Sequence, residues 1–329
     1  MLKKEILYSL RDISIVPAVS TDIKSRKECY PLRWSIEHYD KFFPIIASPM
    51  DSVLDETNWT AYWDNRINCI IPRTVSIEER INLCNAIFCA FSLKEAKEIF
   101  LDKDINSQKF FVLIDIANGS MLEQINLGAE LKKKYGNKIF LMGGNIGNPQ
   151  TYLLYDSAGF DFLRVGVGSG NGCLTSTNTA IHYPYASLIS DISEMKYRYH
   201  SHCKIIADGG MSGYSDIIKS LALGADYVMC GRIFAQAAKT DDELGKELIY
   251  RGMSTKEAQK AMGNTVLKTA EGRSINIVKQ YTLAGWVENF DSYLRSAMSY
   301  CDSRDLKEFR QKAICQVISP NSSSQINDK

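Results

Sequence analysis

The stretch IADGGMSGYSDIIKSLALGADYVMCG, residues 206–231, decides the fold. It starts in an apolar run, passes through paired glycines into a helical stretch, and ends in a second apolar run, YVMCG (227–231). Short, continuous apolar runs are typical of strands that are buried on both faces of a parallel sheet. The stretch therefore predicts one βαβ unit, with small and polar residues where each strand ends.

Eight such runs recur along the chain, and segments with helix-start patterns connect them. Ser76 with Glu79, and Ser92 with Glu95, each fit a capping box, which satisfies free N–H groups at a helix N-terminus. Eight alternating units predict an α/β protein with one domain, a (β/α)8 TIM barrel. A doubly wound open sheet is the alternative, although no GxGxxG motif opens the first βα turn. The runs are PIIAS (44–48), NCIIP (68–72), AIFCAF (86–91), FFVLID (110–115), IFLMG (139–143), FLRVG (162–166), KIIAD (204–208) and YVMCG (227–231).

Length and composition bound the class of protein. The 329 residues accommodate one barrel, which we place in residues 1–318 with an N-terminal extension, followed by a polar, disordered tail at 319–329. The net charge of +1 gives no electrostatic basis for binding nucleic acid, and no apolar run approaches the roughly 20 residues of a membrane span. Nine cysteines without a CxxC pair, and a charged N-terminus without a secretory segment, predict free thiols in the cytoplasm.

The loop VGVGSGNGCLTST (165–177) sets four glycines around Cys173. Glycine permits positive φ and a close approach of the backbone to a ligand. Two interpretations of Cys173 stay open. It is either a small buried hydrophobe or a nucleophile, whose thiolate requires a partly exposed, electropositive setting. Thr175 follows two residues later and is placed to relay a proton.

The ends of the last two predicted strands indicate a phosphate site, because TIM barrels commonly bind phosphate there through backbone N–H groups. Gly209, Gly210 and Gly231 allow the backbone to approach an anion, and Arg232 adds positive charge. The alternative is that these glycines serve tight turns only. Asp208 would repel a phosphate, so we expect it to accept hydrogen bonds from ribose hydroxyls.

Six segments carry motifs that occur together in one enzyme family: DISIVPAVS (12–20), ASPMDSV (47–53), GVGSGNGCLT (166–175), IADGGMSGYSDIIKSLALGADYVMCG (206–231), YRGMS (250–254) and LRSAMSYC (294–301). In this order they resemble the IMP dehydrogenase/GMP reductase family over nearly the whole chain. The resemblance implies a barrel enzyme that acts on a purine nucleoside monophosphate with a nicotinamide cofactor. It also implies the family's usual homotetramer.

The resemblance implies catalytic roles for three residues. Cys173 would attack C2 of the purine and form a covalent thioimidate, while Thr175 and Glu271 would handle the proton. The backbone carbonyls of Gly168, Gly170 and Cys173 would bind a monovalent cation, with K⁺ as the candidate. The substrate GMP or IMP would contact Ser48, Met50, Asn171, Asp208, Gly209, Gly210, Gly231, Arg232, Tyr250, Gly252, Met253 and Ser254. The cofactor would contact Asp115, Ala117, Asn118 and Gly119.

Within the family, the resemblance favours the reductase, which converts GMP to IMP and ammonia with NADPH. DIANG (115–119), GMS (252–254) and YP (183–184) resemble its motifs, and the segment between Met253 and Glu271 has neither an Arg-Tyr pair nor room for a long flap. Other features depart from it. SPMD (48–51) is closer to the dehydrogenase, IPRTVS (71–76) matches neither branch, and Asn171 and Leu174 replace a usual serine and threonine. The alternatives are an IMP dehydrogenase that makes XMP with NAD⁺, a purine-nucleotide-binding barrel without this activity, and a flavin-dependent barrel oxidoreductase.

Overall fold

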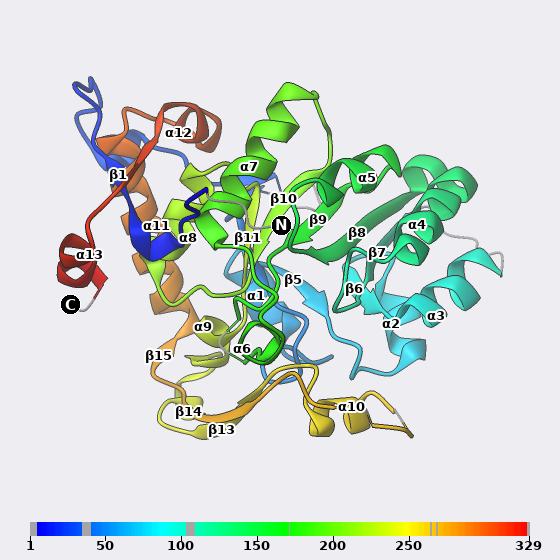
Figure 1. Cartoon of the computed structure of the whole chain (residues 1–329). Coiled ribbons are helices and arrows are strands. Elements are labelled where there is room, and N and C mark those ends of the chain that lie inside the picture. Colours follow the sequence, from blue (N-terminus) through cyan, green and yellow to red (C-terminus); the bar gives the residue numbers. More distant parts are fainter. Residues whose placement is uncertain are drawn as a thin grey trace.

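The computed structural model contains a closed barrel of eight parallel strands (Figure 1). It describes residues 5–34, 41–102, 109–170, 172–263, 265–267 and 269–327. The barrel strands are β4 (Ile45–Ala47), β5 (Asn68–Ile71), β6 (Phe88–Phe91), β7 (Phe110–Ile114), β8 (Ile139–Ile146), β9 (Phe162–Val165), β10 (Lys204–Asp208) and β11 (Tyr227–Cys230). They pair in the order β4 to β11 around the barrel, and β11 closes it by pairing with β4. The predicted (β/α)8 barrel is confirmed, and each of the eight apolar runs coincides with a barrel strand, although β8 extends three residues beyond its run.

Helices follow the strands and cover the outside of the barrel. Ser92 with Glu95 forms the complete capping box of α3, as predicted. At α2 only half of the predicted box is present: Ser76 accepts a hydrogen bond from the Glu79 N–H, and between these two described residues the return bond from the Glu79 side chain is not formed. The α-helices up to the hairpin lobe are α1 (Trp59–Asp64), α2 (Ile77–Leu83), α3 (Leu93–Ala96), α4 (Leu122–Tyr135), α5 (Thr151–Ser157), α6 (Thr175–Thr179), α7 (Tyr185–Arg198), α8 (Tyr214–Ala222) and α9 (Arg232–Ala235). Single turns of other helix types are η1 (Leu10–Asp12), η2 (Arg26–Glu28), η3 (Lys97–Leu101), η4 (Gly136–Lys138) and η5 (Asp241–Glu243).

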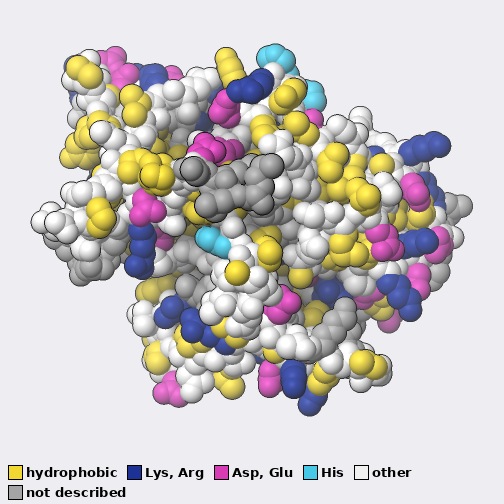
Figure 2. All heavy atoms as spheres, viewed as in Figure 1, with side chains coloured by type: hydrophobic (Ala, Val, Ile, Leu, Met, Phe, Trp, Pro, Cys, Tyr) yellow, Lys and Arg dark blue, Asp and Glu magenta, His cyan; other side chains and the backbone are white. Residues whose placement is uncertain are grey.

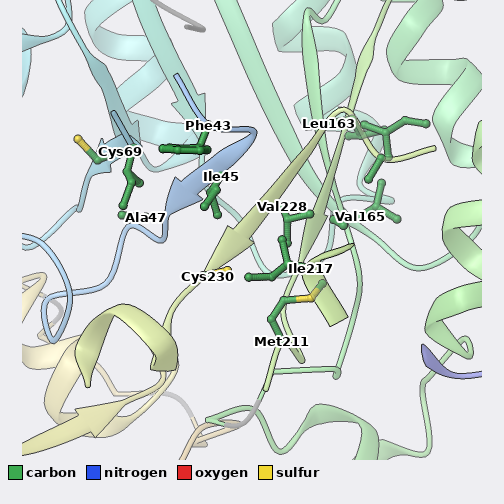
Figure 3. Close-up of a cluster of buried hydrophobic side chains, with 14 of the residues drawn as sticks. Phe43, Ile45, Ala47, Cys69, Leu163, Val165, Met211, Ile217, Val228 and Cys230 are labelled. Atoms are coloured by element: carbon green, nitrogen blue, oxygen red, sulfur yellow. The ribbon is translucent and has the colours of Figure 1, made fainter. Parts of the chain in front are cut away.

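The strands are buried on both faces, which explains why they appear as continuous apolar runs rather than as alternating patterns. Successive side chains point to opposite faces of a strand. Met229 of β11 belongs to the cluster inside the barrel, whereas its neighbours Val228 and Cys230 belong to the cluster between the barrel and the helices. Figure 3 shows Val228 and Cys230 pointing toward Ile217 of α8.

The two ends of the chain are joined beside the barrel. Strand β1 (Ile13–Val16) pairs antiparallel with β16 (Ile314–Val317), which follows α11 (Leu283–Tyr300) and α12 (Leu306–Lys312). The expected irregular tail is instead helix α13 (Pro320–Asn327). Ser323 Oγ donates to the Arg11 carbonyl over 2.7 Å, so the helix docks against the N-terminal segment. Its polar composition gave no indication of this tertiary contact.

A hairpin lobe extends from one edge of the barrel, near α6 and α9 (Figure 1). It consists of the antiparallel strands β13 (Glu247–Arg251) and β14 (Ser274–Val278), with α10 (Lys256–Ala261) between them. Four shorter strands form two further pairs: β2 (Arg33–Trp34) with β3 (Lys41–Phe42), and β12 (Ala237–Ala238) with β15 (Tyr281–Thr282). The lobe brings residues 250–254 and 271 to the barrel.

The surface agrees with the small net charge. Figure 2 shows positive and negative side chains interspersed over this face of the molecule, without a broad area of one sign. Across the described ranges, no helix has both the length and the apolar character that a membrane crossing requires.

Candidate active site

A cavity of about 690 Å³ opens where the barrel strands end, at the face that carries the active site in TIM barrels. Its wall includes nearly all the residues predicted from the sequence. Asn171 lies outside the described residues, and Gly119 does not line the cavity. The predicted residues in the wall are Ser48, Met50, Asp115, Ala117, Asn118, Gly168, Gly170, Cys173, Thr175, Asp208, Gly209, Gly210, Gly231, Arg232, Tyr250, Gly252, Met253, Ser254 and Glu271.

Cys173, Thr175 and Glu271 form a hydrogen-bonded chain in the cavity wall. Cys173 Sγ lies 3.3 Å from Thr175 Oγ1, which donates to Glu271 Oε2 over 2.7 Å. All nine cysteines are free, and Cys173 is partly exposed whereas seven of the others are buried. This setting supports the interpretation of Cys173 as a nucleophile rather than as a small buried hydrophobe. The chain gives a proton a continuous path between the thiol and the carboxylate.

Backbone contacts bring Glu271 to the cysteine loop across 96 residues of sequence. Leu174 N–H donates to the Glu271 carbonyl over 2.7 Å, and Arg273 N–H donates to the Gly172 carbonyl over 3.0 Å. Gly252 packs so closely that a Cβ there would lie 2.7 Å from the Gly172 oxygen. The hairpin lobe is therefore fixed to the loop by main-chain atoms, independently of the catalytic side chains.

The loops after β10 and β11 keep their end of the cavity open. Gly209 and Gly210 have φ of +97° and +77°, a region that residues with a Cβ rarely adopt. At Gly231 a Cβ would lie 2.9 Å from both Met50 Sδ and the Tyr250 hydroxyl oxygen. Geometry thus requires glycine at these positions, and the missing side chains leave backbone exposed to a ligand.

Tyr250 and Arg232 give this end donors for an anion. Burial, with a contribution from the charge of Asp208, raises the pKa of Tyr250 to about 12, so its phenol keeps its proton. Arg232 Nε is buried and has no hydrogen-bond partner among the described residues. Because an unpaired buried donor is costly, this guanidinium favours an acceptor inside the cavity.

A buried network that the sequence analysis did not identify lies beside the predicted ribose site. Arg164 of β9 donates from Nε to Asp208 Oδ2 over 2.9 Å and from Nη1 to Asp115 Oδ1 over 2.7 Å. Asn145 Nδ2 also donates to Asp208 Oδ2, over 2.7 Å. Burial lowers the pKa of Arg164, but the charges of Asp208 and Asp115 outweigh it and raise that pKa. An arginine inside the apolar run FLRVG was the pattern that could have indicated buried acidic partners.

Gly119, which the resemblance placed at the cofactor, instead supports this network from behind. Its N–H donates to the Asn145 carbonyl over 2.8 Å, and its own carbonyl accepts from the Tyr155 hydroxyl over 2.7 Å. A Cβ at this position would lie 2.6 Å from the Asn145 oxygen. The glycine is needed for this close backbone approach.

Arg73 and Lys94, which the sequence analysis did not single out, extend the cavity wall beyond Asp115. Arg73 Nε lies 3.8 Å from Glu95 Oε2 and has no hydrogen-bond partner among the described residues. Glu95 is already engaged by Arg80 over 2.8 Å. Arg73 therefore leaves positive charge available at this end of the cavity.

The glycine loop offers neutral oxygen donors. The Gly168 carbonyl accepts from Ser176 Oγ over 2.8 Å, and the Gly170 carbonyl accepts from Cys173 N–H over 2.9 Å. A carbonyl oxygen has two lone pairs, so each keeps one for a cation. In the described part of the chain, no group of three or more His, Cys, Asp and Glu side chains is arranged to hold a metal ion.

Comparison with known proteins identifies the family. The family model described as "IMP dehydrogenase / GMP reductase domain" matches residues 90–327. The chain belongs to the IMP dehydrogenase/GMP reductase family. The resemblance of the sequence motifs to this family is thereby confirmed.

Three relatives from this family, each named GMP reductase, align over almost their whole length. The protein of Caenorhabditis elegans is 25% identical over 342 residues, covering 95% of this chain and 92% of the relative. The protein of Staphylococcus epidermidis is 28% identical over 320 residues, covering 92% of this chain and 94% of the relative. The protein of Enterococcus faecalis is 26% identical over 329 residues, covering 96% of this chain and 97% of the relative.

Proposed function

We propose that this protein is a GMP reductase, an oxidoreductase that converts GMP to IMP and ammonia with NADPH. The observation that carries this proposal is the chain from Cys173 through Thr175 to Glu271 in the cavity wall. A thiol linked through a hydroxyl to a carboxylate suits both attack at a purine carbon and protonation of a departing amine. Family membership and the shared name of the relatives support it.

In the proposed reaction, the Cys173 thiol passes its proton through Thr175 to Glu271, and the resulting thiolate attacks C2 of GMP to form a sulfur–carbon bond. Glu271, through Thr175, delivers a proton to the amino group on C2, and the carbon–nitrogen bond breaks as ammonia leaves. The purine is then held on Cys173 as a thioimidate. When bound, the nicotinamide cofactor supplies the hydride that reduces C2. The sulfur–carbon bond then breaks, Cys173 departs as a thiolate, and IMP is released.

The nucleotide would lie between Cys173 and the loops after β10 and β11. Asp208 would accept from the ribose hydroxyls. The phosphate would contact backbone at Gly210 and Gly231, with Tyr250 and Arg232 as donors. This assignment is supported by the protonated phenol and by the Nε of Arg232, which has no hydrogen-bond partner in the part of the chain that the structure describes. Met253 and Ser254, on the hairpin lobe, would face the base.

The other end of the cavity suits an anionic cofactor. Asp115, Ala117 and Asn118 would hold it. Arg73, whose Nε has no hydrogen-bond partner among the described residues, and the nearby Lys94 supply positive charge there. The preference for NADPH over NADH rests on the resemblance to the reductase branch.

A monovalent cation, with K⁺ as the candidate, would be held by the backbone carbonyls of Gly168, Gly170 and Cys173. Neutral carbonyl oxygens are suitable donors for such an ion. Its contribution would be to stabilise the loop that carries Cys173. We also propose a homotetramer, following the family, and a cytoplasmic location, which the nine free thiols support.

Absorbance at 340 nm tests the assignment. With GMP and NADPH the signal should fall, with one ammonia formed per NADPH consumed. With IMP and NAD⁺ it should not rise steadily, because the segment between Met253 and Glu271 has no Arg-Tyr pair to activate water. Steady formation of XMP would instead identify a dehydrogenase.

A further inference from the structure

One buried arginine joins carboxylates at the ends of two different strands. Arg164 is 11% exposed, and its partners Asp115 and Asp208 are 17% and 11% exposed. Asp208 ends β10, and Asp115 directly follows β7. Both carboxylates line the cavity, on either side of Arg164 in the barrel order.

We propose that Arg164 is a positioning residue that couples the nucleotide and cofactor subsites, so that a change at either carboxylate alters binding at the other. This inference rests on the proposed function, in which Asp208 serves the nucleotide and Asp115 the cofactor.

The geometry of the guanidinium carries the coupling. Nε bonds Asp208 Oδ2 and Nη1 bonds Asp115 Oδ1, and both nitrogens belong to one rigid plane. A rotation that follows one carboxylate therefore misdirects the donor that faces the other. The two bonds are charge-assisted, so their directions are well defined.

The positive charge of Arg164 also couples the two carboxylates. A single positive charge is shared between two carboxylates, and the raised pKa of Arg164 keeps it ionised. If one carboxylate loses its charge, the whole charge of the guanidinium acts on the other. That remaining carboxylate then becomes a weaker acceptor for a ribose hydroxyl.

Asn145 holds Asp208, the carboxylate on the nucleotide side of Arg164, in place. Its Nδ2 donates to Asp208 Oδ2, the oxygen that Arg164 also bonds, and to the Gly166 carbonyl over 3.1 Å. Asp208 Oδ2 is therefore fixed by two donors, and among the described residues no donor occupies Oδ1, which is the oxygen left for a ligand. The preorganised carboxylate needs no reorientation when the nucleotide binds.

Titration calorimetry with IMP alone and with NADP⁺ alone tests the coupling at a fixed salt concentration. Asp115→Asn should weaken the affinity for IMP, and Asp208→Asn should weaken that for NADP⁺, each about fivefold or more, the lower range of coupling between two sites. Each substitution leaves the whole guanidinium charge on the remaining carboxylate and weakens one of the two bonds that orient Arg164. Asp161→Asn is the matched control, since Asp161 pairs with Lys132 over 2.6 Å outside the cavity. It should leave both affinities within about twofold, the ordinary range of a remote substitution.

A double-mutant cycle distinguishes positioning by Arg164 from a general disturbance of the folded structure. In Arg164→Lys the charge remains, but one ammonium cannot hold two carboxylates in a fixed plane. Adding Asp115→Asn to this variant should therefore lower the affinity for IMP by a smaller factor than in the wild-type background, because only the electrostatic part of the coupling remains. If Asp115→Asn has no effect on IMP binding in the wild-type background, or the same effect in both backgrounds, the coupling is refuted. If the wild-type protein binds neither IMP nor NADP⁺, the proposed function itself fails.

Discussion

Replacing Glu271 by glutamine should slow loss of the amine far more than it disturbs the site. The Leu174 N–H bonds the Glu271 main-chain carbonyl, so the loop and the lobe stay together when the side chain changes. A glutamine oxygen can still accept from Thr175 Oγ1 across the present 2.7 Å. What disappears is the group that holds and delivers the proton.

General acid–base help of this kind contributes about 10²–10⁴-fold, so the rate of ammonia release should fall by about 10²-fold or more. A factor of about 10² corresponds to roughly 2.7 kcal/mol of activation free energy. The affinity for GMP should change little, because the hydrogen bond and the shape of the cavity remain. The reduction step should also suffer less, since no proton moves to nitrogen during it.

Rapid mixing distinguishes the two steps. NADPH consumption from GMP at 340 nm reports amine loss followed by reduction, whereas formation of NADPH from IMP and NADP⁺ reports the hydride step alone. Glu257→Gln provides the matched control, because Glu257 is exposed on α10 of the same lobe. Equal losses in both assays, or turnover of GMP within about threefold of the wild-type rate, would refute this role for Glu271.

Three other expectations concern the nucleophile, the ribose site and the barrel. Cys173→Ser should abolish NADPH consumption while calorimetry shows nearly unchanged binding of IMP, because no alkoxide forms at neutral pH without a stronger base. Asp208→Ala should weaken IMP binding by about 1–3 kcal/mol, since Arg164 and Asn145 lose their acceptor; unchanged affinity would remove Asp208 from the site. Asp226→Asn should lower the free energy of unfolding by about 3–5 kcal/mol in urea titrations, because its buried carboxylate pairs with Lys196, Arg33 and Arg310. These charges outweigh burial and hold the pKa of Asp226 well below its usual range. The stabilisation should therefore be present above about pH 4 and disappear in more acidic solution. An unfolding free energy that is independent of pH down to about pH 2 would contradict this.

The fold follows from the sequence because its determinants are local. Strands buried on both faces are mostly apolar, so eight separate runs were visible without any knowledge of their pairing. The same holds for the cysteine loop, since Cys173 and Thr175 are two residues apart and the glycines around them are needed for the local backbone. Glu271 could be assigned to the site only through the family resemblance.

Tertiary structure decided the features that depend on distant neighbours. In the sequence, Arg164 looks like an interruption of an apolar strand. In the folded barrel, Asp115 and Asp208 lie on either side of it and form ion pairs with it. Gly119 is the last residue of the predicted cofactor motif, yet its backbone faces Asn145 instead of the cavity. The terminal helix α13 forms where a polar composition indicated an irregular tail, because the pairing of β1 with β16 places it against Arg11. In each case the partner is far away in sequence, so the hydrogen bond or ion pair that determines the residue's role exists only in the folded chain.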